Sequence, residues 1–277
     1  MLPTDFQFSQ SNLQDFVDCP RRFQLRYLQQ LKWPAAKADP VLAYEQHTRQ
    51  GAIFHRLVQQ HNLGVPADLL SQTVHDDDNN VLRQWWQNYL EYGLADLPVQ
   101  RQSEIALATP LGNYRLIAKY DLLAIEPGQK AVIVDWKTST RRPKRERLLA
   151  QLQTVVYRYV LVKAGAHLNG GEAIKPEQVT MVYWFANHPD NPAHFPYSTT
   201  EFTGDEQALL SLVKDIESRG EDDFDLTDDT RRCFFCTYRS LCERGEKAGN
   251  FLEMELEAEA DGEDFDFDFD QIAEIAF

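Results

Sequence analysis

Apolar and polar positions follow a helical repeat in three stretches of the first hundred residues. Apolar side chains recur every three or four positions over residues 10–30, 47–64 and 81–94. This spacing predicts amphipathic helices. Ser11 is a suitable N-cap for the first stretch, and Pro20 should divide that stretch into two helices. The N-terminal region is therefore expected to be mainly helical.

The pattern changes after this region. Three apolar or alternating runs fill residues 103–138 and are separated by "PLGN" and "EPGQ", both of which are turn sequences. They predict three strands joined by tight turns. A helix is expected over 145–163, strands over 178–186 and 193–202, and a helix over 204–218. This order predicts an α/β domain whose sheet begins with antiparallel strands.

Two aspartates are placed symmetrically about the second turn. Asp121 lies seven residues before Gly128 and Asp135 lies seven after it. A hairpin centred on Gly128 would place them opposite each other, with Cβ atoms about 4.5–5.5 Å apart. Like charges this close need a cation between them, and carboxylates suit Mg²⁺ or Mn²⁺. Lys137, two residues beyond Asp135, should project from the same face of the sheet, and Trp136 from the other.

A divalent metal, two acids and a lysine suit phosphodiester hydrolysis. The metal would lower the pKa of a bound water and polarise the phosphate, and the lysine would stabilise developing negative charge. A basic segment that follows, interrupted only by Glu146, could hold substrate phosphates; it comprises Arg141, Arg142, Lys144, Arg145 and Arg147. The alternative for an Asp-x-Lys sequence taken alone is a surface ion pair at a strand end.

These residues, in this order, resemble a known signature. Asp121, Asp135-Trp136-Lys137 and Gln153-x-x-x-Tyr157 are similar to the motifs of the PD-(D/E)XK nuclease superfamily, RecB-like branch. The resemblance implies a restriction-endonuclease-like core, with a mixed central sheet flanked by helices. The helical region of about 20–100 would then be an insertion in a nuclease-like domain that covers residues 1–250.

The resemblance also implies the site residues. The catalytic set would be Glu104, Asp121, Asp135 and Lys137. A histidine in the sequence Gly51-x-x-x-His55 would bind the metal with Asp121 and Asp135, although a histidine taken alone is more often an ordinary core or surface residue. His61 has no such context. The DNA path would be bordered by Gln153, Tyr157, Arg141, Arg142, Lys144 and Arg145.

The four cysteines form a widely separated set. Cys233, Cys236 and Cys242 are spaced C-x2-C-x5-C, and Cys19 stands 214 positions before them. Four thiolates could bind Zn²⁺ or an iron–sulfur cluster, and the spacing does not decide between them. The sequence around Cys19, "DCPRRFQLRYL", resembles iron–sulfur RecB-like nucleases of the AddB type and of CRISPR spacer processing. This resemblance implies a 4Fe-4S cluster that clasps the N-terminal helices to the cysteine segment 233–242.

Negative charge is concentrated at the end of the chain. The net charge is −15, and residues 253–277 contain eleven acids without Lys or Arg, which leaves −4 for the rest. We expect residues 251–277 to be a disordered tail. It could serve solubility, cover the basic segment as a nucleic-acid mimic, or dock on a protein partner.

Compartment and function follow from these features. The N-terminal sequence "MLPTDFQFSQ" lacks the pattern of a secretory signal, and no apolar run reaches the roughly 20 residues of a membrane span. We expect a cytoplasmic protein. Its expected activity is that of a metal-dependent DNA nuclease, and the resemblance favours an exonuclease of DNA repair, recombination or CRISPR adaptation. The alternatives are a nuclease-like module that binds DNA without cutting, and an acidic interaction protein with a nucleic-acid-mimicking tail.

Overall fold

The computed structural model describes residues 2–33, 39–75, 80–94, 96–234 and 236–245. The α-helices are α1 (Gln10–Asp18), α2 (Pro20–Phe23), α3 (Asp39–Asn62), α4 (Ala67–His75), α5 (Asn80–Tyr92), α6 (Arg145–Ala150), α7 (Leu152–Ala164) and α8 (Thr199–Ser218). Shorter turns of π- or 3₁₀-helix are Gln24–Leu28, Gly165–Leu168, Pro176–Gln178 and Thr230–Cys233. Within these ranges, no helix combines the length and hydropathy needed to span a lipid bilayer. The expected tail, 251–277, lies outside the described residues.

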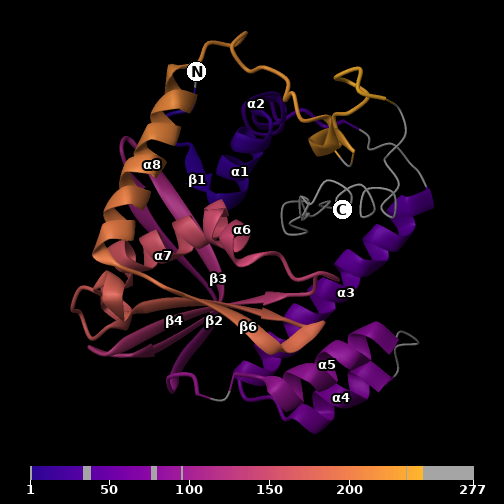
Figure 1. The fold of residues 1–277 in the computed structure, drawn as a ribbon, viewed down its shortest axis with the longest axis vertical. Helices are drawn as coiled ribbons and strands as arrows, with labels where there is room; N and C mark the ends of the chain where they lie inside the picture. Colours follow the sequence, from indigo (N-terminus) through magenta and orange to yellow (C-terminus); the bar gives the residue numbers. More distant parts are fainter. Residues whose placement is uncertain (1, 34–38, 76–79, 95, 235, 246–277) are drawn as a thin grey trace.

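A mixed sheet of six strands forms the centre of the molecule (Figure 1). The strands are β1 (Gln7–Ser9), β2 (Gln100–Leu111), β3 (Tyr114–Glu126), β4 (Lys130–Lys137), β5 (Val179–Phe185) and β6 (His188–Pro196). Their order is β1-β3-β4-β5-β6, and β2 pairs with β3. The pairs β1–β3 and β4–β5 are parallel, and the other pairs are antiparallel. The predicted α/β class with a mixed sheet between helices is confirmed.

Strand β3 has one partner along one edge and two partners along the other. Strand β2 pairs with the first edge along almost the whole length of β3. Strands β1 and β4 share the second edge. The β1 ladder ends at Ile117, and the β4 ladder begins at Leu122. The residues between them, ending with Asp121, therefore lie at a fork in the sheet.

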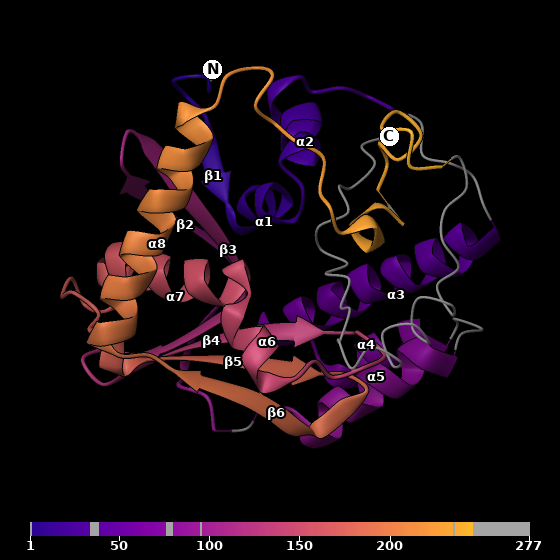
Figure 2. The same cartoon turned by 45° about the horizontal axis from the view of Figure 1, so that its top comes forward.

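Each face of the sheet buries its own apolar core. Helices α1, α7 and α8 lie over one face, and helices α3, α4 and α5 cover the other (Figures 1 and 2). Trp136 packs on the second face with other indole rings, namely those of Trp85, Trp86 and Trp184. Its neighbours Asp135 and Lys137 therefore project toward the first face, as the alternation of a strand requires.

Segments from the two ends of the described chain lie side by side. The Trp33 indole donates a hydrogen bond to Ser240 Oγ (2.8 Å), and the Tyr238 hydroxyl donates to the Leu31 carbonyl (2.9 Å). Asp18 pairs with Arg232 at 3.0 Å. These contacts bring the N-terminal helical region against the cysteine segment.

Several predicted boundaries were wrong. The single helix expected over 145–163 is two helices, because Gln151 adopts an extended conformation (ψ 137°) between α6 and α7. The strand expected over 193–202 ends at Pro196, since Ser198 caps α8 by accepting from the Glu201 N–H. The first helix is capped by Ser9, whose side chain accepts from Asn12 N–H, and Ser11 lies inside that helix.

Candidate active site

The register of the β3–β4 hairpin brings the two predicted aspartates next to each other. Leu122 lies opposite Val134, so Asp121 and Asp135 occupy the next opposed position, as the turn centred on Gly128 predicts. There the ladder gives way to a side-chain contact, because the Trp136 N–H donates to Asp121 Oδ2 at 2.9 Å. The Asp121 carboxylate is thus fixed to the end of β4.

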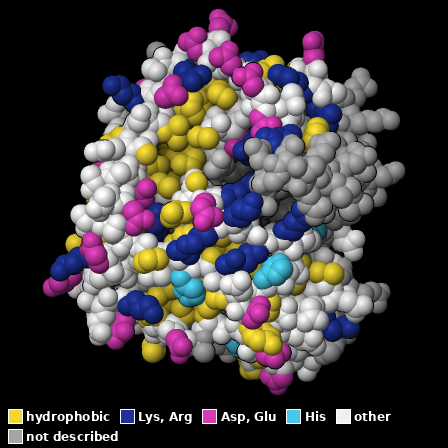
Figure 3. All heavy atoms as spheres, viewed as in Figure 1, with side chains coloured by type: hydrophobic (Ala, Val, Ile, Leu, Met, Phe, Trp, Pro, Cys, Tyr) yellow, Lys and Arg dark blue, Asp and Glu magenta, His cyan; other side chains and the backbone are white. Residues whose placement is uncertain are grey.

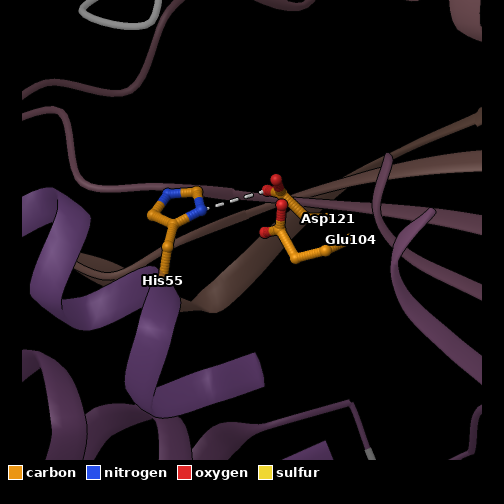
Figure 4. A group of neighbouring side chains, drawn as sticks. All are labelled: His55, Glu104 and Asp121. Atoms are coloured by element: carbon orange, nitrogen blue, oxygen red, sulfur yellow. Dashed lines mark ion pairs between the residues drawn. The ribbon is translucent and has the colours of Figure 1, made fainter. Parts of the chain in front are cut away.

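Three side chains from different elements converge at the fork. His55 comes from α3, Glu104 from β2 and Asp121 from β3, and one ligand atom of each lies within 4.8 Å of the others (Figure 4). His55 Nδ1 is 3.4 Å from Asp121 Oδ2. We call these three residues the metal-ligand group. One imidazole and two carboxylates form a donor set that suits a divalent cation, so the residues present fit such an ion.

A glycine allows α3 to approach the sheet closely enough for this contact. Gly51 lies one turn before His55, and a Cβ built on it would be 3.1 Å from Thr138 Oγ1, tighter than usual van der Waals contact. The Thr138 carbonyl also lies 3.1 Å from Nε2 of His47, on the same helix. The Gly51-x-x-x-His55 sequence therefore has a physical basis: the glycine permits close packing, and the next turn presents the imidazole to Asp121.

Glu104 adopts an unusual backbone conformation. Its φ of 55° lies in the left-handed region, which residues other than glycine seldom adopt. The β2–β3 register places Glu104 across from Asp121, between the pairs Ser103–Leu122 and Ile105–Tyr120. The local strain therefore occurs at the position where Glu104 joins the metal-ligand group.

Asp135 belongs to a second cluster, which we call the lysine cluster: Asp135, Lys137 and Gln153. Lys137 Nζ lies 3.1 Å from Asp135 Oδ2 and donates to Gln153 Oε1 at 2.9 Å. The Gln153 amide nitrogen donates to Asp135 Oδ1 at 2.7 Å. Gln153 therefore holds the acid and the lysine together from α7. The Tyr183 ring lies beneath the ammonium, 5.6 Å from Nζ to its centroid.

The surroundings favour the charged form of Asp121. Burial alone would raise its pKa, but His55, the Trp136 N–H and Lys137 together outweigh burial and lower the pKa below its usual range. A carboxylate that stays ionised at neutral pH is ready to bind a cation.

The structure regroups the predicted metal ligands. His55 and Asp121 lie together as expected, and Glu104 joins them. Asp135 instead contacts Lys137 and Gln153, and its side chain is only 3% exposed. The alternative His61 is engaged elsewhere, with Nδ1 2.9 Å from the Tyr89 hydroxyl.

Comparison with protein families decides the identity. The family model of the PD-(D/E)XK nuclease superfamily matches residues 7–243. The chain belongs to the PD-(D/E)XK nuclease superfamily. Among solved structures, the nuclease is similar to SSO0001 (15% identity, 88% of this chain and 89% of that chain, TM-score 0.41). It is also similar to a candidate exonuclease from Eubacterium rectale (10% identity, 76% and 80% coverage, TM-score 0.44). A search of curated proteins found no match.

The predicted DNA-contacting residues divide into buried and surface groups. Gln153 and Tyr157 of the nuclease are 3% and 7% exposed, so they offer little side chain to a substrate. Arg141, Lys144 and Arg145 are exposed, and Arg142 is half-buried. Arg142 and Arg145 lie over the rings of Phe185 and Phe195. On the face of the molecule that Figure 3 shows, basic side chains gather near the middle, where α6 and β6 lie in Figure 1.

The four cysteines line one small cavity. Arginine side chains share its wall, namely those of Arg22, Arg232 and Arg239. Burial raises the pKa of Cys242 to about 11, and Cys236 and Cys19 add to the rise. Burial also raises the pKa of Cys233 and of Cys236. Thiols with raised pKa values, such as these three, are difficult to ionise unless a cationic group binds them, so the cavity with its four cysteines fits a metal ion or cluster.

Two further residues at the site were not expected from the sequence. Lys119 pairs with Glu104, at 2.6 Å from Nζ to Oε2. Tyr183 accompanies the lysine cluster, and its hydroxyl is 2.7 Å from Thr154 Oγ1. Lys119 could have been identified from the alternation of β3, since it lies two residues before Asp121. Tyr183 depends on the parallel pairing of β4 with β5, which no local pattern reveals.

Proposed function

We propose that this nuclease is a metal-dependent deoxyribonuclease that acts as an exonuclease on DNA ends or single strands. The observation that carries the proposal is the convergence of His55, Glu104 and Asp121 beside Lys137. The superfamily supports phosphodiester hydrolysis and a nucleic-acid substrate.

Each residue has a role in the proposed reaction. His55, Glu104 and Asp121 would hold Mg²⁺ or Mn²⁺, and Asp135, opposed to Asp121 across the hairpin, is proposed as a further ligand. The bound ion would lower the pKa of a water and polarise the phosphate. Lys137, paired with Asp135, would stabilise negative charge on the phosphate. Gln153 would position this lysine, since its amide contacts both members of the pair.

The basic segment would bind the DNA backbone. Three of its members, Arg141, Lys144 and Arg145, are exposed on the surface that follows Lys137 in the chain. The Ser139 hydroxyl donates to the Arg141 carbonyl at 2.9 Å, which orders the start of the segment. Asn187 donates to the carbonyls of Thr138 and Ser139 and fixes the loop to the turn between β5 and β6. A tethered cationic loop beside the reacting lysine suits phosphate contacts.

We also propose that Cys19, Cys233, Cys236 and Cys242 hold a 4Fe-4S cluster. The shared cavity and the neighbouring arginines support this assignment. The cluster would connect the two ends of the domain.

A cleavage assay tests the catalytic proposal. Protein purified without oxygen would be incubated with end-labelled single- and double-stranded DNA in Mg²⁺, Mn²⁺ or EDTA. Lys137→Met should abolish cutting, whereas Lys130→Met, at the exposed opposite end of β4, should retain it. Equal activity of the two variants would show that Lys137 is misassigned.

The binding-module alternative predicts a different outcome of the same assay. A nuclease-like domain that only holds DNA would shift the labelled strand in a gel without shortening it, in every metal. The intact metal-ligand group and lysine cluster favour catalysis over this alternative.

The acidic tail is proposed to regulate DNA binding or to bind a protein partner. Deletion of residues 253–277 should tighten DNA binding at low salt if the tail competes with DNA for the basic segment, and salt should reduce the difference. Identical binding by the full-length and shortened proteins would leave solubility or partner docking as its role.

A further inference from the structure

A lysine borders the metal-ligand group from outside. Lys119 lies opposite Ala106 in the β2–β3 ladder, beside the position where Glu104 faces Asp121. Its ammonium is 2.6 Å from Glu104 Oε2, and its side chain is 68% exposed. An ion pair whose cation is this exposed contributes little to folding. Stability therefore gives no sufficient reason for a cation at this place.

An ammonium at the position of Lys119 should, in contrast, have a large effect on metal binding. If Glu104 gives one oxygen to a metal and keeps the other near Lys119, the ammonium lies roughly 4–6 Å from the ion, given metal–oxygen bonds of about 2.1 Å. A dication and an ammonium at this separation repel each other, which lowers the affinity for the metal about three- to tenfold even with strong solvent screening. Lys119 should therefore weaken metal binding in the absence of nucleic acid.

An anion between the two cations reverses this effect. A phosphate group that binds the metal and Lys119 together is attracted by both charges, and Glu104 is then left to the metal. The exposure of Lys119 allows its long side chain to turn from the carboxylate to a ligand that arrives from solvent. The chemistry of the position thus favours a metal–phosphate pair over a metal alone.

We propose that Lys119 is a phosphate-binding residue that makes the binding of metal and nucleic acid cooperative. The inference rests on the proposed function, because it assigns a partner to the metal-ligand group. Coupling between two ligands is reciprocal, so nucleic acid should raise metal affinity by the same factor by which metal raises the affinity for nucleic acid.

Calorimetric titration with Mn²⁺ tests the coupling on the full-length protein. The probe is a phosphorothioate-linked oligothymidylate, a single strand that resists cleavage. Without it, Lys119→Gln should bind Mn²⁺ about three- to tenfold more tightly than the parent. With the probe, the gain in Mn²⁺ affinity should be about tenfold in the parent and should largely disappear in Lys119→Gln. Lys130→Gln, an exposed lysine of β4, is the matched control and should behave as the parent.

The outcomes separate this inference from the proposal beneath it. Glu104→Gln and Asp121→Asn should both lose Mn²⁺ affinity. If both variants keep it, the metal-ligand group is misassigned, and the role of Lys119 is overturned with it. If these two lose affinity while Lys119→Gln shows the parent's affinity and the parent's response to the probe, only the coupling role is wrong. Thermal melts of each variant check that the fold is retained.

Discussion

The metal-ligand group and the cysteine cavity are assembled in opposite ways. The metal-ligand group comes from a helix and two central strands, and backbone ladders determine where its side chains lie. The cysteines come from short turns at the two ends of the described chain, joined by side-chain contacts. In this region Asp15 pairs with Arg22 and Arg26, and Asp18 pairs with Arg22 and Arg232.

The difference concerns what each region needs from its cofactor. The acids near the metal-ligand group already have cationic neighbours in the protein, because Lys119 contacts Glu104 and Lys137 contacts Asp135. In the cysteine cavity, burial raises the pKa of Cys233, Cys236 and Cys242 in spite of the arginines beside them. Loss of the divalent metal should therefore remove activity and leave the fold intact, whereas loss of the cysteine-bound group should destabilise the fold.

The largest effect is expected from Asp121→Asn. The amide oxygen can still accept from the Trp136 N–H, but the metal loses a charged ligand. Cleavage should fall by on the order of 10²–10³-fold or more, and the melting temperature should change by no more than about 2 °C. Rates on end-labelled DNA and a thermal melt measure both quantities. Asp190→Asn, at an exposed position of β6, is the control. Parental cleavage by Asp121→Asn would refute the assignment of this acid.

A smaller effect, and one on stability, is expected from Cys19→Ala. Protein purified without oxygen should be brown and contain iron and sulfide, and the variant should lose both. Because the cluster would close a loop of more than 200 residues, its loss should cost about 3–5 kcal/mol and lower the melting temperature by roughly 10 °C. Once the cluster has been removed from the parent protein, the parent and Cys19→Ala should melt at similar temperatures. One zinc and no iron in the parent would contradict the cluster.

A double-mutant cycle on Gly51 and Thr138 tests the close packing of α3. Alanine within a helix is favoured over glycine by about 1 kcal/mol, but in Gly51→Ala the contact with Thr138 Oγ1 should oppose that gain. In a Thr138→Ala background, which removes the hydroxyl, the gain should appear in full. Unfolding in urea measures the four free energies. Additive effects would show that the close approach has no energetic consequence.

The smallest effect concerns pH and the contact between His47 and the Thr138 carbonyl. Burial lowers the pKa of His47, although the Thr138 carbonyl partly opposes this. A histidine whose folded pKa is depressed favours unfolding as pH falls below its unfolded value near 6.5, since the unfolded chain binds the proton more readily. His47→Gln should therefore flatten the loss of stability between about pH 6.5 and 5. His167→Gln, on an exposed 3₁₀ turn, should not. If stability falls with pH equally steeply in both variants, His47 is not the cause of the loss.

The register of the site could be predicted because it is local. The turn at Gly128, with φ of 77°, joins two apolar strands, and alternation alone then assigns Asp135, Trp136 and Lys137 to their faces. Strand β1 was missed because its three residues pair with β3, which is distant in sequence. The break at Gln151 was missed because neither glycine nor proline marks it.

The composition of the metal-ligand group depended on tertiary structure. Periodicity could not show that α3 places His55 at the fork, and only the resemblance suggested this histidine and Glu104. The same limit applied to Gln153. Its spacing from Tyr157 indicated only a shared helix face, and the resemblance placed that face along the DNA. The packing of α7 on the sheet instead buries Gln153 against Asp135 and Lys137.

The most direct test of the central claim is the position of a bound metal. Crystals of the nuclease soaked in Mn²⁺ would be measured for anomalous scattering from manganese. We predict a peak within about 2.0–2.3 Å of ligand atoms from His55, Glu104 and Asp121. A peak elsewhere, with these three side chains retaining the contacts described above, would contradict the assignment of the active site.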